Sequence, residues 1–175
     1  MGKLILILGG ARSGKSAFAE ELAKGHKRVA YIATALVADD EMRRRVVLHR
    51  KRRPKNWVTY EARLKLDSTI RKAAKAATLV LVDCMTLYLS NAMIAASGKR
   101  RGHEAILKDV EGVCKASRST DADVVVVSNE VGLGIVPDTP LGREFRDLQG
   151  KANQIIARAA DEVYFVVAGI PQKIR

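Results

Sequence analysis

The feature that most constrains this chain is a glycine-rich loop close to its N-terminus. An apolar run, Leu4–Leu8, leads into the loop, and a segment with helical spacing, Lys15–Lys24, leads out of it. The loop matches the pattern G-x4-G-K-[ST] and consists of Gly9, Gly10, Ala11, Arg12, Ser13, Gly14, Lys15 and Ser16. In such a loop the glycines let successive N–H groups point at phosphate oxygens, and the following helix adds its positive end. The order strand, loop, helix predicts a site for a nucleoside triphosphate, and the absence of G-x-G-x-x-G argues against a dinucleotide fold.

Two side chains of this loop and one acid elsewhere are the candidates for handling phosphate and metal. Lys15 should reach the terminal phosphates, and the Ser16 hydroxyl should ligate Mg²⁺. Asp83 directly follows the apolar run Leu79–Val82, the pattern by which a carboxylate at a strand end enters the Mg²⁺ shell. The alternative role for Asp83 is to cap a helix that begins near Thr86.

The rest of the chain alternates between short apolar runs and segments with helical spacing. We expect strands over Leu4–Leu8, Val29–Ala33, Leu79–Val82, Asp123–Val127 and Val163–Ala168, and helices over Lys15–Lys24, Glu41–Arg53, Arg63–Ala76, Glu104–Ser117 and Leu141–Ala160. Nearly continuous apolar strands are typical of a parallel sheet covered on both faces. The expected fold is therefore α/β, a mostly parallel, doubly wound sheet of the P-loop NTPase type with helices on both faces. Residues 1–175 should form a single nucleotide-binding domain.

The chain is strongly basic, with 31 Lys and Arg against 19 Asp and Glu, a net charge of +12. Eleven of the basic residues lie in two short stretches, 43–55 and 99–101, and the remaining twenty nearly balance the acids. A local excess of this kind suits a phosphorylated substrate, a nucleic acid or an anionic membrane, or is a solvated helix face with a basic loop.

Cysteine content and hydropathy bear on where the protein works. Two cysteines, Cys84 and Cys114, argue against a disulfide scaffold and indicate a reducing compartment. No apolar run is long enough to span a bilayer, so we expect no membrane insertion. The N-terminal apolar run lacks a cleavage site and reads as the first strand, which predicts a cytoplasmic protein.

His49 lies within the basic stretch, on the expected helix Glu41–Arg53. Helical spacing places it on one face with Arg45 and Arg53. Neighbouring cations should lower the pKa of the imidazole and keep it neutral near pH 7. A neutral imidazole among guanidinium groups suits attack on phosphorus, although spacing alone favours a surface histidine on a charged helix. His26 and His103 have no such surroundings and should be solvated.

A loop with two glycines and a proline, Ser128–Pro137, follows the expected strand Asp123–Val127. Open α/β sheets bind ligands at the carboxyl ends of their strands. Asn129 and Glu130 are thus candidates for binding substrate or sensing the terminal phosphate, or they brace the loop.

Together these residues resemble the bifunctional adenosylcobinamide kinase / adenosylcobinamide-phosphate guanylyltransferase family of cobalamin biosynthesis. The resemblance runs nearly end to end and rests on the following segments: Gly9–Ser16, Tyr31–Thr34, Asp40–Met42, Arg45 through His49 and Arg53 to Glu61, Val82–Thr86, Ser128–Pro137, Phe145–Asp147 and Ala168–Pro171. Their occurrence in order and at matching spacing is far more specific than the phosphate loop alone.

The resemblance implies two reactions on one chain. The first phosphorylates a hydroxyl of adenosylcobinamide with ATP or GTP, and the second moves GMP from GTP onto that phosphate, releasing pyrophosphate. It implies that His49 carries GMP as a covalent intermediate and that the enzyme is a homotrimer. Carried over by position, the GTP contacts are Gly9–Ser16, Thr34, Ala35, Leu36, Arg50, Lys51, Arg52, Arg53, Glu61 and Asp83.

Two other functions remain as alternatives. The chain could be a plain small-molecule kinase in which His49 is idle. It could also be a nucleic-acid-binding P-loop protein that uses its basic helix, although an aromatic content of only 5% leaves few side chains on which bases could stack. The resemblance favours the two-step enzyme and no nucleic-acid partner.

Overall fold

The computed structural model describes residues 1–35, 40, 43–44, 46–47, 50, 53–96 and 102–175. Within these residues the strands are β1 (Leu4–Gly9), β2 (Val29–Ala33), β3 (Val58–Glu61), β4 (Leu79–Asp83), β5 (Asp123–Asn129), β6 (Glu162–Val167) and β7 (Ile170–Lys173). They form one sheet in the order β3-β2-β4-β5-β1-β6-β7. Neighbouring strands are parallel except β6 and β7, which are antiparallel.

The central strands are buried on both sides because alternate residues enter two separate cores. In β1, Leu4 and Leu6 pack into one core, while Ile5 and Ile7 pack into the other. The valines of β5 divide in the same way. This explains why the strands read as continuous apolar runs without alternation.

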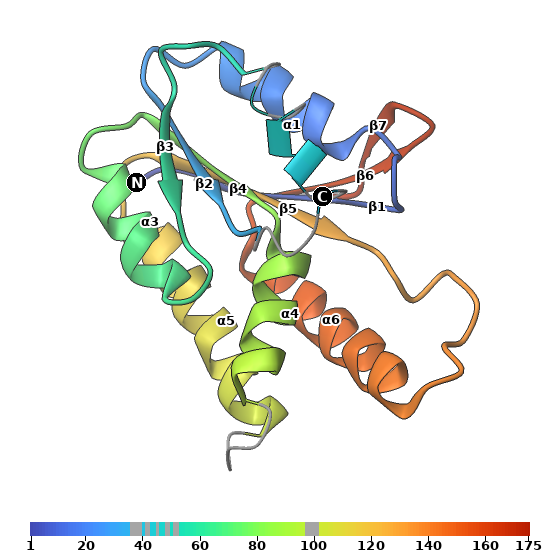
Figure 1. The fold of residues 1–175 in the computed structure, drawn as a ribbon. Coiled ribbons are helices and arrows are strands. Elements are labelled where there is room, and N and C mark those ends of the chain that lie inside the picture. Colours follow the sequence, from blue (N-terminus) through green and yellow to red (C-terminus); the bar gives the residue numbers. More distant parts are fainter. Residues whose placement is uncertain (36–39, 41–42, 45, 48–49, 51–52, 97–101) are drawn as a thin grey trace.

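The helices cover the two faces of the sheet unequally (Figure 1). Their bounds are α1 (Lys15–Lys24), α3 (Leu66–Ala74), α4 (Met85–Ala96), α5 (His103–Arg118) and α6 (Pro140–Ala159). Helix α1 packs on one face through Ala19 and Ala23. The other four helices lie on the opposite face and cover the larger core. No helix in the described residues is long and apolar enough to cross a membrane.

The expected mostly parallel sheet with helices on both faces is confirmed, and all five expected strands are present. Two short edge strands, β3 and β7, were not among the expected elements, and the apolar helix α4 was expected only as a helix that begins near Thr86. In the expected helix Glu41–Arg53, the described residues Arg43, Arg44, Val46, Val47 and Arg50 are helical. His49 lies outside the described residues, as do Leu36, Arg45, Lys51, Arg52 and the basic stretch 99–101.

The carboxyl ends of the parallel strands, where a ligand site is expected, lie at one edge of the sheet. Gly9 at the end of β1 is level with Asn129 of β5, and Ala33 of β2 is level with Asp83 of β4. Glu61 ends β3 beside Ala33. Because these strands are parallel, the loops that follow them all lie at the same carboxyl edge.

Candidate functional site

The phosphate loop follows β1 at this edge and is held tightly against its neighbours. Gly9 and Gly14 have φ angles of +155° and +100°, values that residues with a Cβ rarely adopt. A Cβ on Gly9 would lie 2.5 Å from the Val166 carbonyl oxygen, and one on Gly14 would lie 2.9 Å from the Gly169 Cα. The two glycines are therefore required by the close approach of β6 and of the turn after it.

The turn between β6 and β7 supports the phosphate loop directly. Gly169 N–H donates to the Ser13 carbonyl oxygen at 2.8 Å. Ala168 and Gly169 both have positive φ, as in the tight turns that join antiparallel strands. From the sequence, Ala168–Pro171 was only a part of the resemblance, and its contact with the loop follows from a pairing between distant segments.

Lys15 is nearly buried, 7% exposed, at the start of α1. Its Nζ donates to the Gly10 carbonyl oxygen at 2.5 Å, so the amine lies inside the curl of the loop. Burial lowers the pKa of this lysine, while nearby Cys84 and Asp83 act in the opposite direction. The structure thus places a poorly hydrated cation where phosphate oxygens would bind.

Ser13 adds an unusual feature to the loop. Its Oγ is buried and has no hydrogen-bond partner among the described residues, a state shared there only by Gln149 Oε1. Buried hydroxyls are normally satisfied, so an orphan inside a phosphate loop marks a place for a ligand.

Asp83 ends β4 and is oriented by a neighbouring tyrosine. The Tyr31 hydroxyl donates to Asp83 Oδ2 at 3.1 Å, and the Arg53 guanidinium lies 3.7 Å from the centre of the tyrosine ring. Burial, and next the Asp83 charge, raise the pKa of Tyr31, so the phenol remains a donor. This arrangement joins Arg53, from the basic stretch, to the predicted metal carboxylate through one aromatic ring.

The residues fit a magnesium site of the kind that keeps phosphate oxygens as ligands. No group of three His, Cys, Asp or Glu side chains in the described part could hold a metal ion. Mg²⁺ at a nucleotide needs only one or two protein oxygens, and the Ser16 hydroxyl and Asp83 carboxylate supply that donor set. Helix α4 begins at Met85, so the capping role of Asp83 also stays a prediction.

Thr34 braces the strand ends. Its Oγ1 donates to the Cys84 carbonyl oxygen at 2.7 Å and accepts from the Cys84 N–H at 2.8 Å. Its own carbonyl accepts from Asn91 at 2.8 Å. Burial raises the pKa of the Cys84 thiol to about 11, so this cysteine stays neutral. Thr34 is fully buried, and its hydroxyl is committed to holding β2 against β4.

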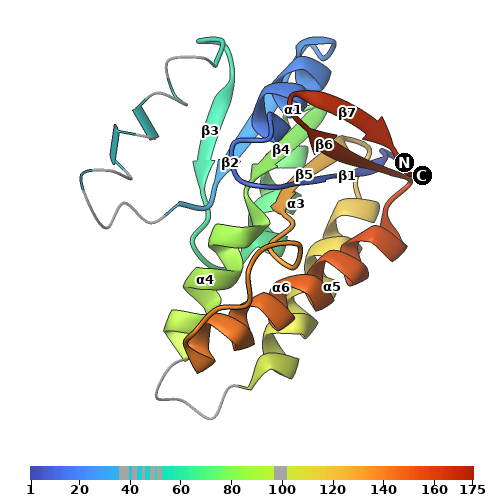
Figure 2. The same ribbon diagram turned by 90° about the vertical axis from the view of Figure 1, so that its right-hand side faces the viewer.

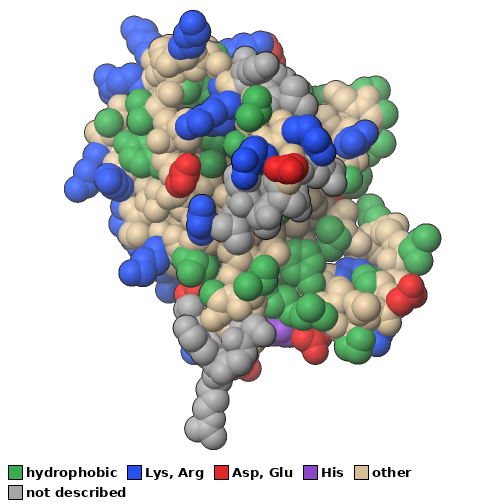
Figure 3. Space-filling view, in the orientation of Figure 1, with side chains coloured by type: hydrophobic (Ala, Val, Ile, Leu, Met, Phe, Trp, Pro, Cys, Tyr) green, Lys and Arg blue, Asp and Glu red, His purple; other side chains and the backbone are tan. Residues whose placement is uncertain are grey.

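Cations line a small hollow toward the amino end of β3. The hollow, about 170 Å³, is lined by Arg50, Arg53, Pro54, Lys55, Trp57 and Thr59. In Figure 3 Lys and Arg side chains are spread over the upper part of the molecule. Arg50 and Arg53, two of the predicted GTP contacts, thus line a basic hollow with an indole. The exposed Glu61 ends β3 at the carboxyl edge of the sheet.

A buried polar network, absent from the sequence analysis, supports the end of β5. Asn153 of α6 accepts from Ser128 Oγ at 2.7 Å and from Gln149 at 2.9 Å, and donates to the Asn129 carbonyl oxygen at 3.0 Å. Asn153 also lies 3.5 Å from Glu130 Oε2. The Glu130 N–H donates to the Gly9 carbonyl oxygen at 2.9 Å. The network therefore couples α6 to the first residue of the phosphate loop.

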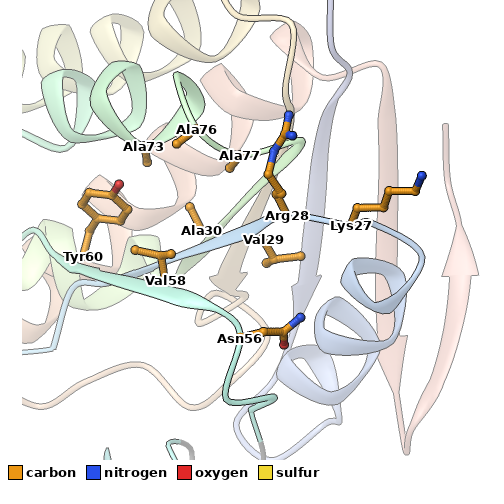
Figure 4. A pocket seen from close by; sticks show the side chains of 10 residues that line it. All are labelled: Lys27, Arg28, Val29, Ala30, Asn56, Val58, Tyr60, Ala73, Ala76 and Ala77. Atoms are coloured by element: carbon orange, nitrogen blue, oxygen red, sulfur yellow. The ribbon is translucent and has the colours of Figure 1, made fainter.

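A second hollow lies at the opposite edge of the sheet, away from the phosphate loop. Figure 4 shows its lining, in which small residues of α3 and the turn after it face β2 and β3. The volume is about 150 Å³, and the lining residues are Lys27, Arg28, Val29, Ala30, Asn56, Val58, Tyr60, Ala73, Ala76 and Ala77. Its position at the amino ends of the strands separates it from the candidate site.

Comparison with known proteins agrees with this geometry. Residues 5–174 match the family described as cobinamide kinase / cobinamide phosphate guanyltransferase. The chain is 41% identical over 180 residues to the bifunctional adenosylcobalamin biosynthesis protein CobU of Escherichia coli K12, covering 98% of this chain and 99% of that protein. It is 43% identical over 171 residues to CobP of Pseudomonas aeruginosa, with 97% and 96% covered.

A solved structure supports the fold independently. It is described as a prototypical ATPase from the type III secretion system of pathogenic bacteria, and the likeness has a TM-score of 0.56 at 12% identity. The match covers 99% of this chain and 57% of the other. At that identity the likeness shows the α/β P-loop fold alone.

Proposed function

The chain belongs to the cobinamide kinase / cobinamide phosphate guanyltransferase family, and we propose that one nucleotide site at the carboxyl edge serves both of its reactions in turn. It is a bifunctional enzyme of cobalamin biosynthesis, acting on a cobinamide substrate with a nucleoside triphosphate. The family match over nearly the whole chain carries this conclusion. A single G-x4-G-K-[ST] loop in the sequence supports one shared site.

In the kinase step the phosphate loop holds the triphosphate of ATP or GTP. Backbone N–H groups of residues 9–16 and the N-terminus of α1 bind the phosphates. Lys15 neutralises charge that develops as the terminal phosphoryl group moves to the substrate hydroxyl. Ser16 and Asp83 would hold Mg²⁺, which when bound offsets the negative charge of the phosphates. Tyr31 supports this role by orienting Asp83.

In the transfer step we assign His49 as the nucleophile that carries GMP. Its nitrogen attacks the α-phosphorus of GTP, a P–N bond forms, and pyrophosphate leaves. The phosphate of the acceptor then attacks the same phosphorus and breaks the P–N bond. The sequence spacing and the family resemblance support this assignment, since His49 lies outside the described residues. Arg50 and Arg53, which line one hollow, would neutralise the departing pyrophosphate.

Label transfer tests the covalent mechanism. Protein incubated with GTP labelled in the α-phosphate should retain label that is labile to acid and stable to alkali. His49→Ala should lose the label and guanylylation while still phosphorylating adenosylcobinamide, whereas the control His103→Ala should keep both activities. Active enzyme that retains no label would contradict the covalent step. Full guanylylation by His49→Ala would exclude His49 as the nucleophile, and a parent enzyme that phosphorylates without guanylylating would favour the plain kinase.

Compartment and assembly belong to the same proposal. Cys84 and Cys114 are both free and buried, in keeping with a reducing cytoplasm. The family resemblance supports a homotrimer, and sedimentation equilibrium of the purified protein measures that assembly directly.

A further inference from the structure

The loop between β5 and α6 carries an unusual concentration of exposed apolar side chains. Leu133 is 79% exposed, Ile135 96% and Val136 54%, and Leu141 at the start of α6 is 64% exposed. In Figure 1 this connection leaves β5 and projects away from the body of the molecule. Exposed apolar groups gathered in so short a segment mark a binding surface.

This apolar loop, residues 131–141, is held in shape at both ends. At its start the Gly132 N–H donates to Glu130 Oε1 at 2.8 Å. At its end Arg143 donates to the carbonyl oxygens of Pro137 and Asp138, both at 2.9 Å. Thr139 caps α6 by accepting from the Gly142 N–H at 3.2 Å. The loop's own polar groups are used to fix its backbone, and the apolar side chains are left facing outward.

The apolar loop also begins beside the phosphate loop. Asn129, the last residue of β5, is level with Gly9, and Glu130 binds the Gly9 carbonyl oxygen. The buried network of Asn153, Gln149 and Ser128 holds the end of β5, where the loop begins, against α6. An acceptor for the terminal phosphoryl group must approach from the carboxyl edge, where this loop begins; in Figure 2 the loop runs across α6 on the side that faces the viewer.

The apolar loop differs in charge from the rest of this basic chain. No Lys or Arg occurs between residues 119 and 142, in a chain that has 31 of them. The ionisable residue within the loop is Asp138, and Glu130 directly precedes it, both acidic; Arg143, just after the loop, donates to the carbonyl oxygens of Pro137 and Asp138. This environment disfavours an anionic partner such as a nucleic acid or an acidic membrane, and it accommodates a neutral or cationic ligand.

A corrinoid has the matching chemistry. It is a large macrocycle edged with methyl groups and neutral amide arms around a cobalt ion, and before phosphorylation it carries no anionic group. We propose that the apolar loop binds the corrin ring of the cobinamide acceptor, with Leu133, Ile135 and Val136 against the ring methyl groups. The assignment rests on the proposed function, because it takes the acceptor from it. The nucleotide then occupies the phosphate loop, and the acceptor arm spans the distance between them.

Two polar substitutions test the proposal. Leu133→Ser and Ile135→Ser remove exposed apolar groups and disturb no described hydrogen bond. Burial of one such side chain against a ligand corresponds to about tenfold or more in affinity. We therefore expect each variant to bind cobinamide at least about tenfold more weakly by equilibrium dialysis, with GTP affinity unchanged. The control Ile174→Ser, at a similarly exposed residue (65%) near the C-terminus, should bind both ligands like the parent.

Sedimentation of each variant separates the acceptor from a second copy of the chain. Weaker cobinamide binding at unchanged assembly supports the proposal. Unchanged cobinamide binding overturns it, and so does a loss that appears only together with dissociation, because the loop would then be a contact between copies. GTP binding and α-phosphate labelling of the same samples report on the proposed function separately. If the parent protein shows neither GTP binding nor α-phosphate labelling, the proposed function is wrong, whatever the apolar loop binds.

Discussion

At the scale of single residues, the site is built from groups whose polarity the fold leaves incompletely satisfied. Lys15 is a nearly buried cation bonded to one loop carbonyl, and Ser13 Oγ is a buried hydroxyl without a partner among the described residues. Both features cost free energy in the folded protein. A triphosphate supplies what both groups lack, negative charge for the amine and acceptor oxygens for the hydroxyl.

Replacement of Lys15 by alanine tests this reasoning. Lys15→Ala should lower the kinase turnover number about 100- to 1000-fold, the usual effect of removing one group that stabilises transition-state charge. The control Lys24→Ala lies on the same helix in an exposed ion pair with Glu21 and should stay within about twofold. Initial rates at saturating nucleotide measure both. A Lys15→Ala enzyme with parental turnover would exclude Lys15 from the reaction.

The same lysine predicts a pH dependence. Burial lowers the pKa of Lys15 from its ordinary value of 10.5, and the charged form is the active one. The amine therefore loses its proton at lower pH than an exposed lysine does, and the kinase rate should begin to fall below pH 10.5. A rate profile that stays flat through that region would argue against a charged Lys15.

The motif predicts the phosphate loop from the sequence because its glycines, lysine and serine are local requirements. The pairings around it are not local. Tyr31 meets Asp83, and Gly169 meets Ser13, only after strands far apart in the chain become neighbours. Gln149 and Asn153 could have been suspected, because they are amides spaced four residues apart beside the apolar stripe of α6. Their partners Ser128 and Asn129 could not, since these depend on where α6 crosses β5.

At the scale of elements, the strands that were predicted are the buried ones and the strands that were missed lie at the edges. Strand β7 reads Ile-Pro-Gln-Lys and is fully exposed, while β3 is mostly exposed. Edge strands need no continuous apolar run, and Pro171 is tolerated in β7 because it pairs on one side only. For helix α4 the sequence predicts only a start near Thr86, because the helix is apolar almost all round and lacks the periodic signal of an amphipathic helix.

One carboxylate, that of Glu162, links the neighbouring strands β1, β6 and β7. Glu162 accepts from Lys3 at 2.8 Å, from the Tyr164 hydroxyl at 2.7 Å and from Lys173 at 3.1 Å. These hydrogen bonds, with Lys3 the strongest influence, lower the pKa of Glu162 to about 2. Since β6 and the turn after it support the phosphate loop, this junction bears on the site as well as on stability.

Glu162→Gln should destabilise the fold in a pH-dependent way. Because the native pKa lies below the ordinary value of 4.5, the stabilisation is present above pH 4.5 and is lost as the pH falls toward 2. We expect a loss of about 1 kcal/mol in the free energy of unfolding at pH 7, after allowance for solvent screening. Urea unfolding at pH 7 and pH 3 measures it, and the difference from the parent should shrink at pH 3. The exposed control Glu21→Gln should change stability by under about 0.5 kcal/mol at either pH. An equal loss at both pH values would mean that packing, not charge, is responsible.

At the scale of the whole molecule, the net charge of +12 is unevenly distributed. The described cations Arg50, Arg53 and Lys55 line a hollow toward the amino end of β3, while the segment 119–142 has no basic residue. Arg53 is linked through Tyr31 to Asp83, and the segment 119–142 includes Asn129, which is level with Gly9 of the phosphate loop. A basic side suited to nucleotide phosphates and an apolar, acidic side suited to a corrinoid would let one site handle donor and acceptor together.

Thermal unfolding distinguishes this use of the charge from general affinity for nucleic acid. A ligand at 100 times its dissociation constant adds about 2.7 kcal/mol of stability, which for a chain of this size raises Tm by about 5–10 °C. We expect GTP with Mg²⁺ to produce such a shift and a DNA duplex at equal phosphate concentration to produce almost none at 150 mM salt. Binding of nucleic acid through the backbone depends steeply on salt, because each neutralised phosphate releases counterions. A DNA-induced shift that matched that of GTP and collapsed between 50 and 200 mM salt would restore the nucleic-acid alternative. A Tm shift specific to GTP, reduced in Lys15→Ala and retained in Lys24→Ala, would show that the excess positive charge serves nucleotide binding at the phosphate loop.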